Sequence, residues 1–374
     1  MSKFPFCKNW KDLITNDCIV VIDSDQTAYQ AAAGAEERSI LVTHKASGKQ
    51  KAFKNRTEFY GKTKNTVGGW LKDQNTNREA KALAAGKEFI PWTRDDFTIE
   101  DVQTPQPLEF CLQTLKMKVT GILNYLGFPR ERCICVLGGK GNFRDDLVAP
   151  QVYKGNREDT LRPIHLKEAR QYLVEHFNAK VIDGIEADDY LSKLAYEGFK
   201  HYKKTGKFSY IVVSFDKDQK GNPCLLFDPM KDDKTHTWKY PFPMLIDDSM
   251  GEVWVEKNKV KGWGRKFFGY QMLCGDSTDN IRPYQDLLPK RSFGDAAALK
   301  ILAGTNTEKE MWSAIVDQYK TWYPDGVKFT DWKGDNQEMT AGQWASIIFQ
   351  MLYMKLEDDD KTTLGKVLRN VGVI

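Results

Sequence analysis

Runs of consecutive apolar residues recur through the first two thirds of the chain. They occupy residues 18–23, 133–139, 179–183, 208–214 and 224–229. Apolar runs of this length, without alternating polar positions, are typical of strands buried on both faces of a parallel sheet. The segments between them carry apolar residues at helical spacing. We expect helices over residues 24–37, 108–128, a segment ending near 177, and 187–203.

Strands that alternate with helices indicate βαβ units, and hence an α/β fold with a mostly parallel central sheet flanked by helices. After Gly264 the apolar spacing is helical almost to the end of the chain. We therefore expect an α/β core over residues 1–263 and a mainly helical region over residues 264–374. Its tryptophans are expected in a core; they are Trp312, Trp322, Trp332 and Trp344.

A basic insertion is expected between residues 39 and 107. Residues 39–61 have the pattern of a β-hairpin that turns at 46–49. Residues 44–87 contain eleven Lys or Arg against three Asp or Glu. Because clustered positive charge binds phosphate groups, we expect this segment to contact nucleic acid without sequence preference. The alternative is a solvated charged surface.

The composition excludes several classes of protein. With 55 Lys and Arg against 51 Asp and Glu, the net charge of +4 does not by itself indicate nucleic acid. No stretch approaches 18 apolar residues and the N-terminus has no signal-peptide core, so no membrane association is expected. Seven cysteines without a CxxC pair indicate the cytoplasm. Five histidines without an HxH or HExxH pattern leave carboxylates as the candidate metal ligands.

Eight carboxylates follow the predicted strands or lie in one acidic motif further on. They are Asp23, Glu186, Asp188, Asp189, Asp216, Asp218, Asp276 and Asp279. Each one alone has a simpler explanation, since Asp is a common turn residue and helix N-cap. Together they would meet at the carboxyl edge of a parallel sheet, where so many anions repel one another without cations. Oxygen-only ligands suit Mg²⁺ or Mn²⁺, and two such ions suit phosphodiester hydrolysis.

These residues resemble the 5′ nuclease superfamily of flap endonucleases and 5′-3′ exonucleases, especially the replication exonucleases of bacteriophages. The chain has EADD at 186–189, SFDKD at 214–218, GDSTDNI at 275–281, and a basic stretch at 143–157. Asp23 corresponds to the family's first-strand aspartate. The motifs occur in the same order as in the family, over residues 18 to about 303. A single motif of this kind is weak evidence, but five in the same order are specific for the family.

The resemblance implies a PIN-like or resolvase-like sheet, a helical arch over residues 140–177, and a helix-hairpin-helix-like segment in the C-terminal DNA-binding region. It implies two metal ions, with Glu186, Asp188 and Asp23 on the first and the other five carboxylates completing both. It assigns the basic residues of the arch to the scissile phosphate; they are Lys154, Arg157 and Arg144. Further DNA contacts are implied for Phe143, Tyr153, Asn156, Lys290, Arg291 and Gly294.

The implied function is a monomeric, two-metal-dependent 5′ nuclease that hydrolyses DNA from 5′ ends or at 5′ flaps in phage-type replication. RNA primers paired to DNA are a further substrate, replication proteins are further partners, and the host cytoplasm is the implied location. One alternative is a catalytically weakened DNA-binding protein of the same fold. The other is a PIN-type ribonuclease, against which the arch and the GDSTDNI motif argue.

The chain departs from the family pattern in two places. Gly139 stands where the family carries an aspartate after the second strand, so one metal contact is missing. Asp145 or Asp146 are candidates to replace it. The family's glycine-rich hairpin, which often binds K⁺, is reduced to Gly294, so a K⁺ site is doubtful.

Overall fold

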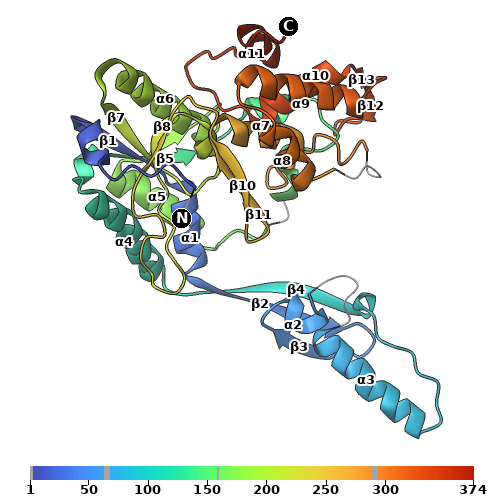
Figure 1. Ribbon diagram of the computed structural model, residues 1–374. Coiled ribbons are helices and arrows are strands. Elements are labelled where there is room, and N and C mark those ends of the chain that lie inside the picture. Colours follow the sequence, from blue (N-terminus) through green and yellow to red (C-terminus); the bar gives the residue numbers. More distant parts are fainter. Residues whose placement is uncertain (1–2, 63–67, 158–159, 289–292) are drawn as a thin grey trace. The chain divides into compact units, whose positions relative to one another are not determined.

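The computed structural model describes residues 3–62, 68–157, 160–288 and 293–374 (Figure 1). The chain divides into two compact units. The sheet unit comprises residues 1–27, 117–161 and 170–374, and the inserted unit comprises residues 28–116 and 162–169. The inserted unit overlaps the basic segment expected at 39–107. The expected division into residues 1–263 and 264–374 stays a prediction.

The sheet unit is built on one mostly parallel sheet, as the apolar runs predicted. Among the described residues it has six strands in the order β6-β5-β1-β7-β8-β9. Every neighbouring pair is parallel except β8 and β9. The strands are β1 (Ile14–Asp23), β5 (Cys133–Gly138), β6 (Lys180–Ile182), β7 (Phe208–Val213), β8 (Cys224–Phe227) and β9 (Met244–Ile246). The expected α/β fold with a mostly parallel sheet is therefore confirmed.

Helix α6 (Ala187–Thr205) lies against β1, β5, β7 and β8. Its apolar side covers a core that includes Val21, Val136, Leu191 and Val212, all without exposed surface. The helix ends at Gly206, whose φ of 76° is a left-handed conformation that glycine adopts without strain. Other helices of the first half are α1 (Asp25–Ala33), α4 (Leu108–Leu126) and α5 (Leu166–Phe177), with short 3-10 turns η1 (Trp10–Leu13), η3 (Arg130–Arg132), η4 (Phe143–Asp146), η5 (Gly155–Arg157) and η6 (Asp218–Gly221).

The C-terminal part is mainly helical, with two hairpins that the pattern did not predict. The hairpins are β10 (Glu252–Glu256) with β11 (Lys259–Trp263), and β12 (Val327–Thr330) with β13 (Asn336–Met339). Trp312, Trp322 and Trp344 are buried in one core, whereas Trp332 is 39% exposed. The helices are α7 (Gly264–Cys274), α8 (Asp295–Ala303), α9 (Glu308–Trp322), α10 (Ala341–Leu352) and α11 (Leu364–Asn370).

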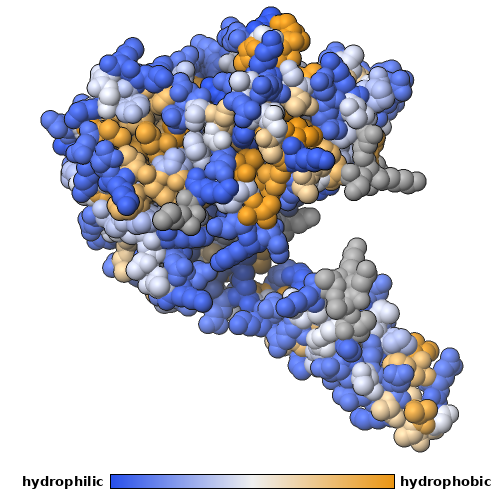
Figure 2. All heavy atoms as spheres, viewed as in Figure 1, coloured by the Kyte–Doolittle hydropathy of each residue, from blue (hydrophilic) through white to orange (hydrophobic). Residues whose placement is uncertain are grey.

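The described part of the inserted unit contains a three-stranded antiparallel sheet in the order β3-β2-β4, together with helices. Phe53, Phe59 and Phe97 form its core. In Figure 2 hydrophobic side chains gather at the end of α3, where Leu83 is 82% exposed. The elements are β2 (Glu36–His44), β3 (Gln50–Phe53), α2 (Arg56–Tyr60), α3 (Gly69–Ala84), η2 (Arg94–Asp96) and β4 (Phe97–Pro105).

Two expectations for this region need correction. The expected hairpin turn at 46–49 is confirmed, but residues 56–60 form a helix, begun by the Asn55 side chain that accepts from the Glu58 N–H. The helix expected to reach Glu37 ends at Ala33 instead. Residues 36–44 pair with β4 over nine consecutive positions, and this long-range ladder outweighs the local helical pattern. No helix among the described residues is long and apolar enough to cross a membrane.

Candidate functional site

The end of β1 and the end of β7 bring two predicted site residues together. Because Ile22 pairs with Val213, the residues that follow both strands lie at the same edge of the sheet. Ser214 donates its hydroxyl to Asp23 Oδ2 at 3.0 Å and accepts the backbone N–H of Asp216 at 2.9 Å. Asp23, with 7% exposure, is therefore held in place by a fully buried serine that also fixes the loop carrying Asp216.

Asp188, on the first turn of α6, faces the same point. Burial and the charges of Asp216 and Asp23 raise the pKa of Asp188 well above its usual range. Burial and the charge of Asp216 likewise raise the pKa of Asp23 to about 6. The charges of Asp23 and Asp216 act on Asp188, and that of Asp216 acts on Asp23, so we treat the three carboxylates together as neighbouring charges. This group is called the strand-end group below.

A second group consists of Asp218, Asp276 and Asp279, which we call the loop group. One oxygen of each lies within 4.8 Å of the others, a spacing that suits a metal ion. Burial and Asp216 raise the pKa of Asp218 to about 7. Gln271 Nε2 donates to Asp218 Oδ1 at 2.5 Å. Asp216 belongs to the strand-end group yet accepts the N–H of Asp218 at 2.8 Å, so the two groups adjoin.

A lysine lies between two carboxylates of the loop group. The Lys217 ammonium lies 2.8 Å from Asp218 Oδ1 and also contacts Asp276 Oδ2. Burial works against ionisation of Asp276, but Lys217 and the Thr278 N–H outweigh it and lower the pKa of Asp276. Lys217 was not among the predicted site residues, although it stands between the two aspartates of the SFDKD motif.

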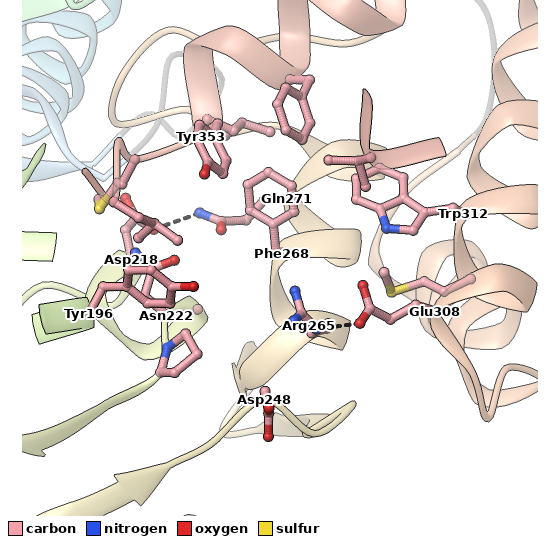
Figure 3. Close-up of a pocket in the computed structure, with 18 of the residues that line it drawn as sticks. Tyr196, Asp218, Asn222, Asp248, Arg265, Phe268, Gln271, Glu308, Trp312 and Tyr353 are labelled. Atoms are coloured by element: carbon pink, nitrogen blue, oxygen red, sulfur yellow. Dashed lines mark hydrogen bonds and ion pairs between the residues drawn. The ribbon is translucent and has the colours of Figure 1, made fainter. Parts of the chain in front are cut away.

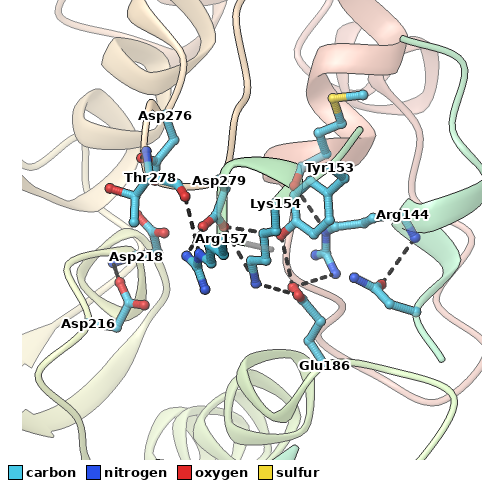
Figure 4. A network of polar contacts seen from close by, with 12 residues as sticks. Arg144, Tyr153, Lys154, Arg157, Glu186, Asp216, Asp218, Asp276, Thr278 and Asp279 are labelled. Carbon is cyan, nitrogen blue, oxygen red and sulfur yellow. Dashed lines mark hydrogen bonds and ion pairs between the residues drawn. The ribbon is translucent and has the colours of Figure 1, made fainter. Parts of the chain in front are cut away.

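The basic stretch of the expected arch faces the loop group (Figure 4). The Lys154 ammonium contacts Glu186 Oε1 and lies 3.6 Å from Asp279 Oδ2. Arg157 contacts Asp279 through Nη2 and donates from Nε to the Thr278 carbonyl at 3.2 Å. Tyr153 donates its hydroxyl to Glu186 at 3.0 Å or to Asp279 at 3.1 Å. Lys154 and Tyr153 thus join Glu186 to the loop group, and Arg157 contacts the loop group alone.

Lys154 is held in its charged form. Burial lowers the pKa of its ammonium, but the carboxylates of Glu186 and Asp279 outweigh burial and raise it overall. Its backbone has a φ of 55°, an uncommon conformation for lysine, and its N–H donates to the Asp279 carbonyl at 3.0 Å. The chain therefore turns sharply at Lys154 and fastens to the GDSTDNI loop.

Arg144 and Asp189 pair with each other in the interior. Arg144 is 2% exposed and Asp189 has no exposed surface. The Arg144 guanidinium also donates from Nε to the Met351 carbonyl at 3.0 Å, and it lies 3.2 Å from Glu186. Arg144 was expected to face a phosphate and Asp189 a metal, whereas the structure turns both toward the protein.

The remaining predicted contact residues occupy varied positions. Phe143 is half-buried, with Arg144 and Lys355 over its ring at 4.5 and 4.3 Å from its centroid. Asn156 donates to the Ser277 carbonyl at 2.9 Å. Gly294 precedes α8 as its N-cap. Lys290 and Arg291 lie outside the described residues.

Gly139 has an acidic neighbour that sequence reasoning missed. A Cβ atom at Gly139 would lie 2.1 Å from Asp183 Oδ1 and 2.6 Å from the Ile182 carbonyl. Asp183 directly follows β6, so it lies at the end of a strand as Asp23 does. Its carboxylate accepts the Lys140 N–H at 2.7 Å. The candidates Asp145 and Asp146 lie on the exposed side of η4. Asp183 thus occupies the space into which an aspartate at 139 would extend.

The donors present fit divalent cations of the magnesium type. Both groups consist of carboxylate oxygens, and no histidine or cysteine of the described chain contributes to the loop group. Hard oxygen ligands in such numbers select Mg²⁺ or Mn²⁺ over Zn²⁺. Burial, and after it the neighbouring carboxylates, raise the pKa values of Asp23, Asp188 and Asp218, and a bound cation would favour their charged forms.

No family model matches the chain, and no curated protein sequence matches it. Two solved structures are similar to it. One is a mutant of the bacteriophage T5 5′-exonuclease, at 14% identity and a TM-score of 0.36, covering 70% of this chain and 91% of that chain. The other is a bacteriophage T5 flap endonuclease variant in a pseudo-enzyme–product complex with DNA and metal ions, at 14% identity and a TM-score of 0.33, covering 70% and 90%.

Proposed function

We propose that the chain is a metal-dependent 5′ nuclease of the 5′ nuclease superfamily, acting on DNA at 5′ ends or 5′ flaps. The observation that carries the proposal is the junction of the two carboxylate groups at the sheet edge, with Lys154 and Arg157 beside them. Carboxylates that lie this close favour the binding of metal ions. The positively charged side chains of Lys154 and Arg157 beside them suit a substrate with negatively charged phosphates.

The strand-end group and the loop group would each hold one divalent ion. When bound, the two ions would lower the pKa of an attacking water and stabilise charge on the leaving oxygen. Ser214 and Gln271 hold Asp23 and Asp218 at fixed positions through hydrogen bonds to one carboxylate oxygen each.

Lys154 and Arg157 would contact the scissile phosphate. Glu186 and Asp279 keep the Lys154 ammonium charged and fix its position. Arg157 is half-exposed, so its planar guanidinium can turn toward a phosphate and hold two oxygens at once. Lys154 therefore stabilises charge during the reaction, and Arg157 positions the substrate.

We assign Arg144 and Asp189 to positioning instead of direct contact. Arg144 joins Glu186, Asp189 and the Met351 carbonyl, and so ties the start of α6 to the C-terminal helices. Because Tyr153 is 8% exposed and its hydroxyl is bound to carboxylates, it supports Glu186 and Asp279 more than it offers a stacking surface. Phe143, Asn156, Lys290, Arg291 and Gly294 remain proposed DNA contacts, and the arch over 140–177 remains proposed with them.

One gel experiment tests the proposal. Duplexes labelled at the 5′ or 3′ end, carrying a 5′ flap, a nick, a blunt end or an RNA primer, are incubated with Mg²⁺ or with EDTA. We expect cleavage from the 5′ end that requires Mg²⁺ and is lost in Asp216→Asn, while the exposed control Asp317→Asn cleaves normally.

The alternative functions give different gels. DNA binding without cleavage by the unmodified protein would identify the weakened DNA-binding protein, and cleavage of RNA alone would identify a ribonuclease. Full cleavage in EDTA would exclude the two-metal mechanism.

A further inference from the structure

A cavity of about 220 Å³ lies beside the loop group, within the sheet unit (Figure 3). It is lined by residues of α6, η6, α7, α9 and α10 and by the chain after α10. Aromatic side chains form part of its wall: Tyr196, Phe268, Trp312, Phe349 and Tyr353 all line it. Pockets for drug-sized ligands occupy roughly 300–1,000 Å³. This cavity is smaller, so it has room for a single ring system.

Polar groups at the cavity offer both donors and acceptors. Arg265 and Glu308 form an ion pair with Nε 2.7 Å from Oε1. The two atoms are close, but they do not form a hydrogen bond. Arg265 Nε is buried and has no hydrogen-bond acceptor among the described residues. Asn222 and Asp248 add an amide and a carboxylate. A ligand with acceptors and donors along one edge would satisfy these groups.

The cavity shares a wall with the loop group. Asp218 and Gln271 both line it, and they are joined by the hydrogen bond from Gln271 Nε2 to Asp218 Oδ1 (Figure 3). Gln271 is 5% exposed and lies on α7, so the contact is fixed by a rigid helix. A group bound in the cavity would therefore lie next to a proposed metal ligand.

The charge of the lining favours an uncharged group. Among the described residues each carboxylate of the lining already has a cation partner: Asp218 pairs with Lys217, Asp248 with Lys203, and Glu308 with Arg265. Because Arg265 is engaged in this way, the lining offers no unpaired cation to a phosphate. Aromatic walls, by contrast, stack on any flat heterocycle, and base–aromatic stacking contributes about 1–3 kcal/mol per base. Among the parts of a nucleotide, the base fits the cavity and the phosphate does not.

We propose that the cavity binds a single base of the nucleic-acid strand being cut. The sugar would then lead out of the cavity, and the phosphate joined to it would lie at the loop group. This inference rests on the proposed function for the identity of the strand, but the base site itself can be tested without cleavage. By holding this base, the cavity would determine which phosphodiester bond of the strand reaches Lys154 and Asp279.

The test measures binding of uncharged nucleosides, adenosine and thymidine, to the full chain in EDTA by ligand-observed NMR and calorimetry. Gly221 lines the cavity and an added Cβ there meets no atom within 4 Å, so Gly221→Leu would fill space without a backbone clash. We expect Gly221→Leu to weaken nucleoside binding at least about tenfold. The matched control Gly342→Leu, at an exposed position with equal space, should bind as the unmodified protein does.

A second variant guards against misfolding of the first. Tyr196→Leu removes one aromatic ring from the wall, and Phe110→Leu likewise replaces an aromatic ring by leucine at a half-exposed site in the inserted unit. The inference is supported if Tyr196→Leu weakens binding and Phe110→Leu does not. It is overturned if the unmodified protein binds neither nucleoside, or if both cavity variants bind as well as their controls.

Cleavage provides a separate readout. If the protein cuts DNA, a substrate with one abasic nucleotide next to the cut should lose the preferred cut position in the unmodified protein. Nucleoside binding without any cleavage would support the proposed base site and contradict the proposed nuclease function. Cleavage without nucleoside binding would support the nuclease function and contradict the base site.

Discussion

Arg144 and Asp189 form a two-pronged ion pair inside the protein, with Nη1 2.7 Å from Oδ2 and Nη2 3.0 Å from Oδ1. The Lys355 N–H donates to the same Asp189 carboxylate at 2.9 Å, and the Tyr353 carbonyl accepts from Arg144 at 2.6 Å. Residues separated by more than 160 positions thus meet at one buried pair. The start of α6, which carries Asp188, is fastened to the C-terminal region through it.

Removing one partner of this pair should lower the free energy of unfolding. Arg144→Met leaves a buried carboxylate without its cation, and breaking a buried pair costs about 3–5 kcal/mol. Denaturant unfolding of Arg144→Met, Asp189→Leu and the double variant gives the coupling energy. We expect the double variant to be more stable than the sum of the two single changes predicts.

The exposed pair Lys328–Glu338, at 2.8 Å with both side chains 71% exposed, is the control. Lys328→Met should change stability by less than about 1 kcal/mol. Equal effects at both pairs would contradict a structural role specific to Arg144 and Asp189.

Without metal, stability should fall as the pH rises from about 4 to 7. Burial and Asp216 raise the pKa of Asp218 to about 7 from its ordinary value of 3.8. Between these values the folded state binds a proton that the unfolded chain has lost, so raising the pH favours unfolding. Asp23, with a pKa raised to about 6, acts in the same direction.

Unfolding measured in EDTA across this window should show the decline, and Asp218→Asn should reduce it because an amide does not ionise. Mg²⁺ should restore stability most strongly at the upper end of the window, where the carboxylates are charged. A flat profile in EDTA would show that other cations already neutralise the site.

Gly139→Asp should destabilise the protein, although the family pattern suggested that it would supply a missing metal ligand. An added Cβ would lie 2.6 Å from the Ile182 carbonyl, which is backbone and has little freedom to move. Gly139→Ala isolates this steric cost from any effect of the carboxylate, and we expect a loss of about 1–3 kcal/mol.

Gly121→Ala is the matched control, because Gly121 lies within α4 and a Cβ there meets no atom within 4 Å. That change should stabilise the protein by about 0.5–1 kcal/mol. If Gly139→Asp were as stable as the unmodified chain and more active at low Mg²⁺, the inference that Asp183 and the Ile182 carbonyl leave no space for a side chain at position 139 would be wrong.

Lys154→Ala should lower the rate of cleavage more than the binding of DNA. A fixed cation stabilises charge that grows in the transition state, and loss of one such donor costs about a hundred- to a thousand-fold in rate. Single-turnover kinetics with enzyme in excess separate rate from binding. Arg157→Ala should weaken both together, because we propose that its half-exposed guanidinium positions the substrate. A normal single-turnover rate for Lys154→Ala would make Lys154 a binding residue only.

The inserted unit should contribute salt-dependent affinity for nucleic acid. Lys49 and Lys54 flank β3 with exposed side chains. Each lysine that neutralises a phosphate adds roughly 0.7–0.9 to the log–log slope of binding against salt, so Lys49→Gln/Lys54→Gln should flatten that slope. Lys320→Gln/Lys328→Gln, an exposed pair of the C-terminal part, is the charge-matched control. Equal slopes for both double variants would contradict a contribution of Lys49 and Lys54 to nucleic-acid binding.

The sequence by itself determined five of the strands of the main sheet described here, its mostly parallel character, and the positions of carboxylates close after several of these strands. Unbroken apolar runs predict strands buried on both faces of a parallel sheet, and the carboxylates close after them were expected to meet at its carboxyl edge if the strands were neighbours. Those expectations depend on local periodicity and on one general property of parallel sheets.

Only the tertiary structure decided which charges meet. The SFDKD motif contains Lys217, but nothing local indicates that its ammonium reaches Asp276, 59 positions away. Likewise, the pairing of Arg144 with Asp189, the place of Asp183 beside Gly139, and the end of α1 before β2 depend on contacts between distant segments. Such contacts follow from packing and burial, which a pattern of polar and apolar positions does not specify for an individual charged side chain.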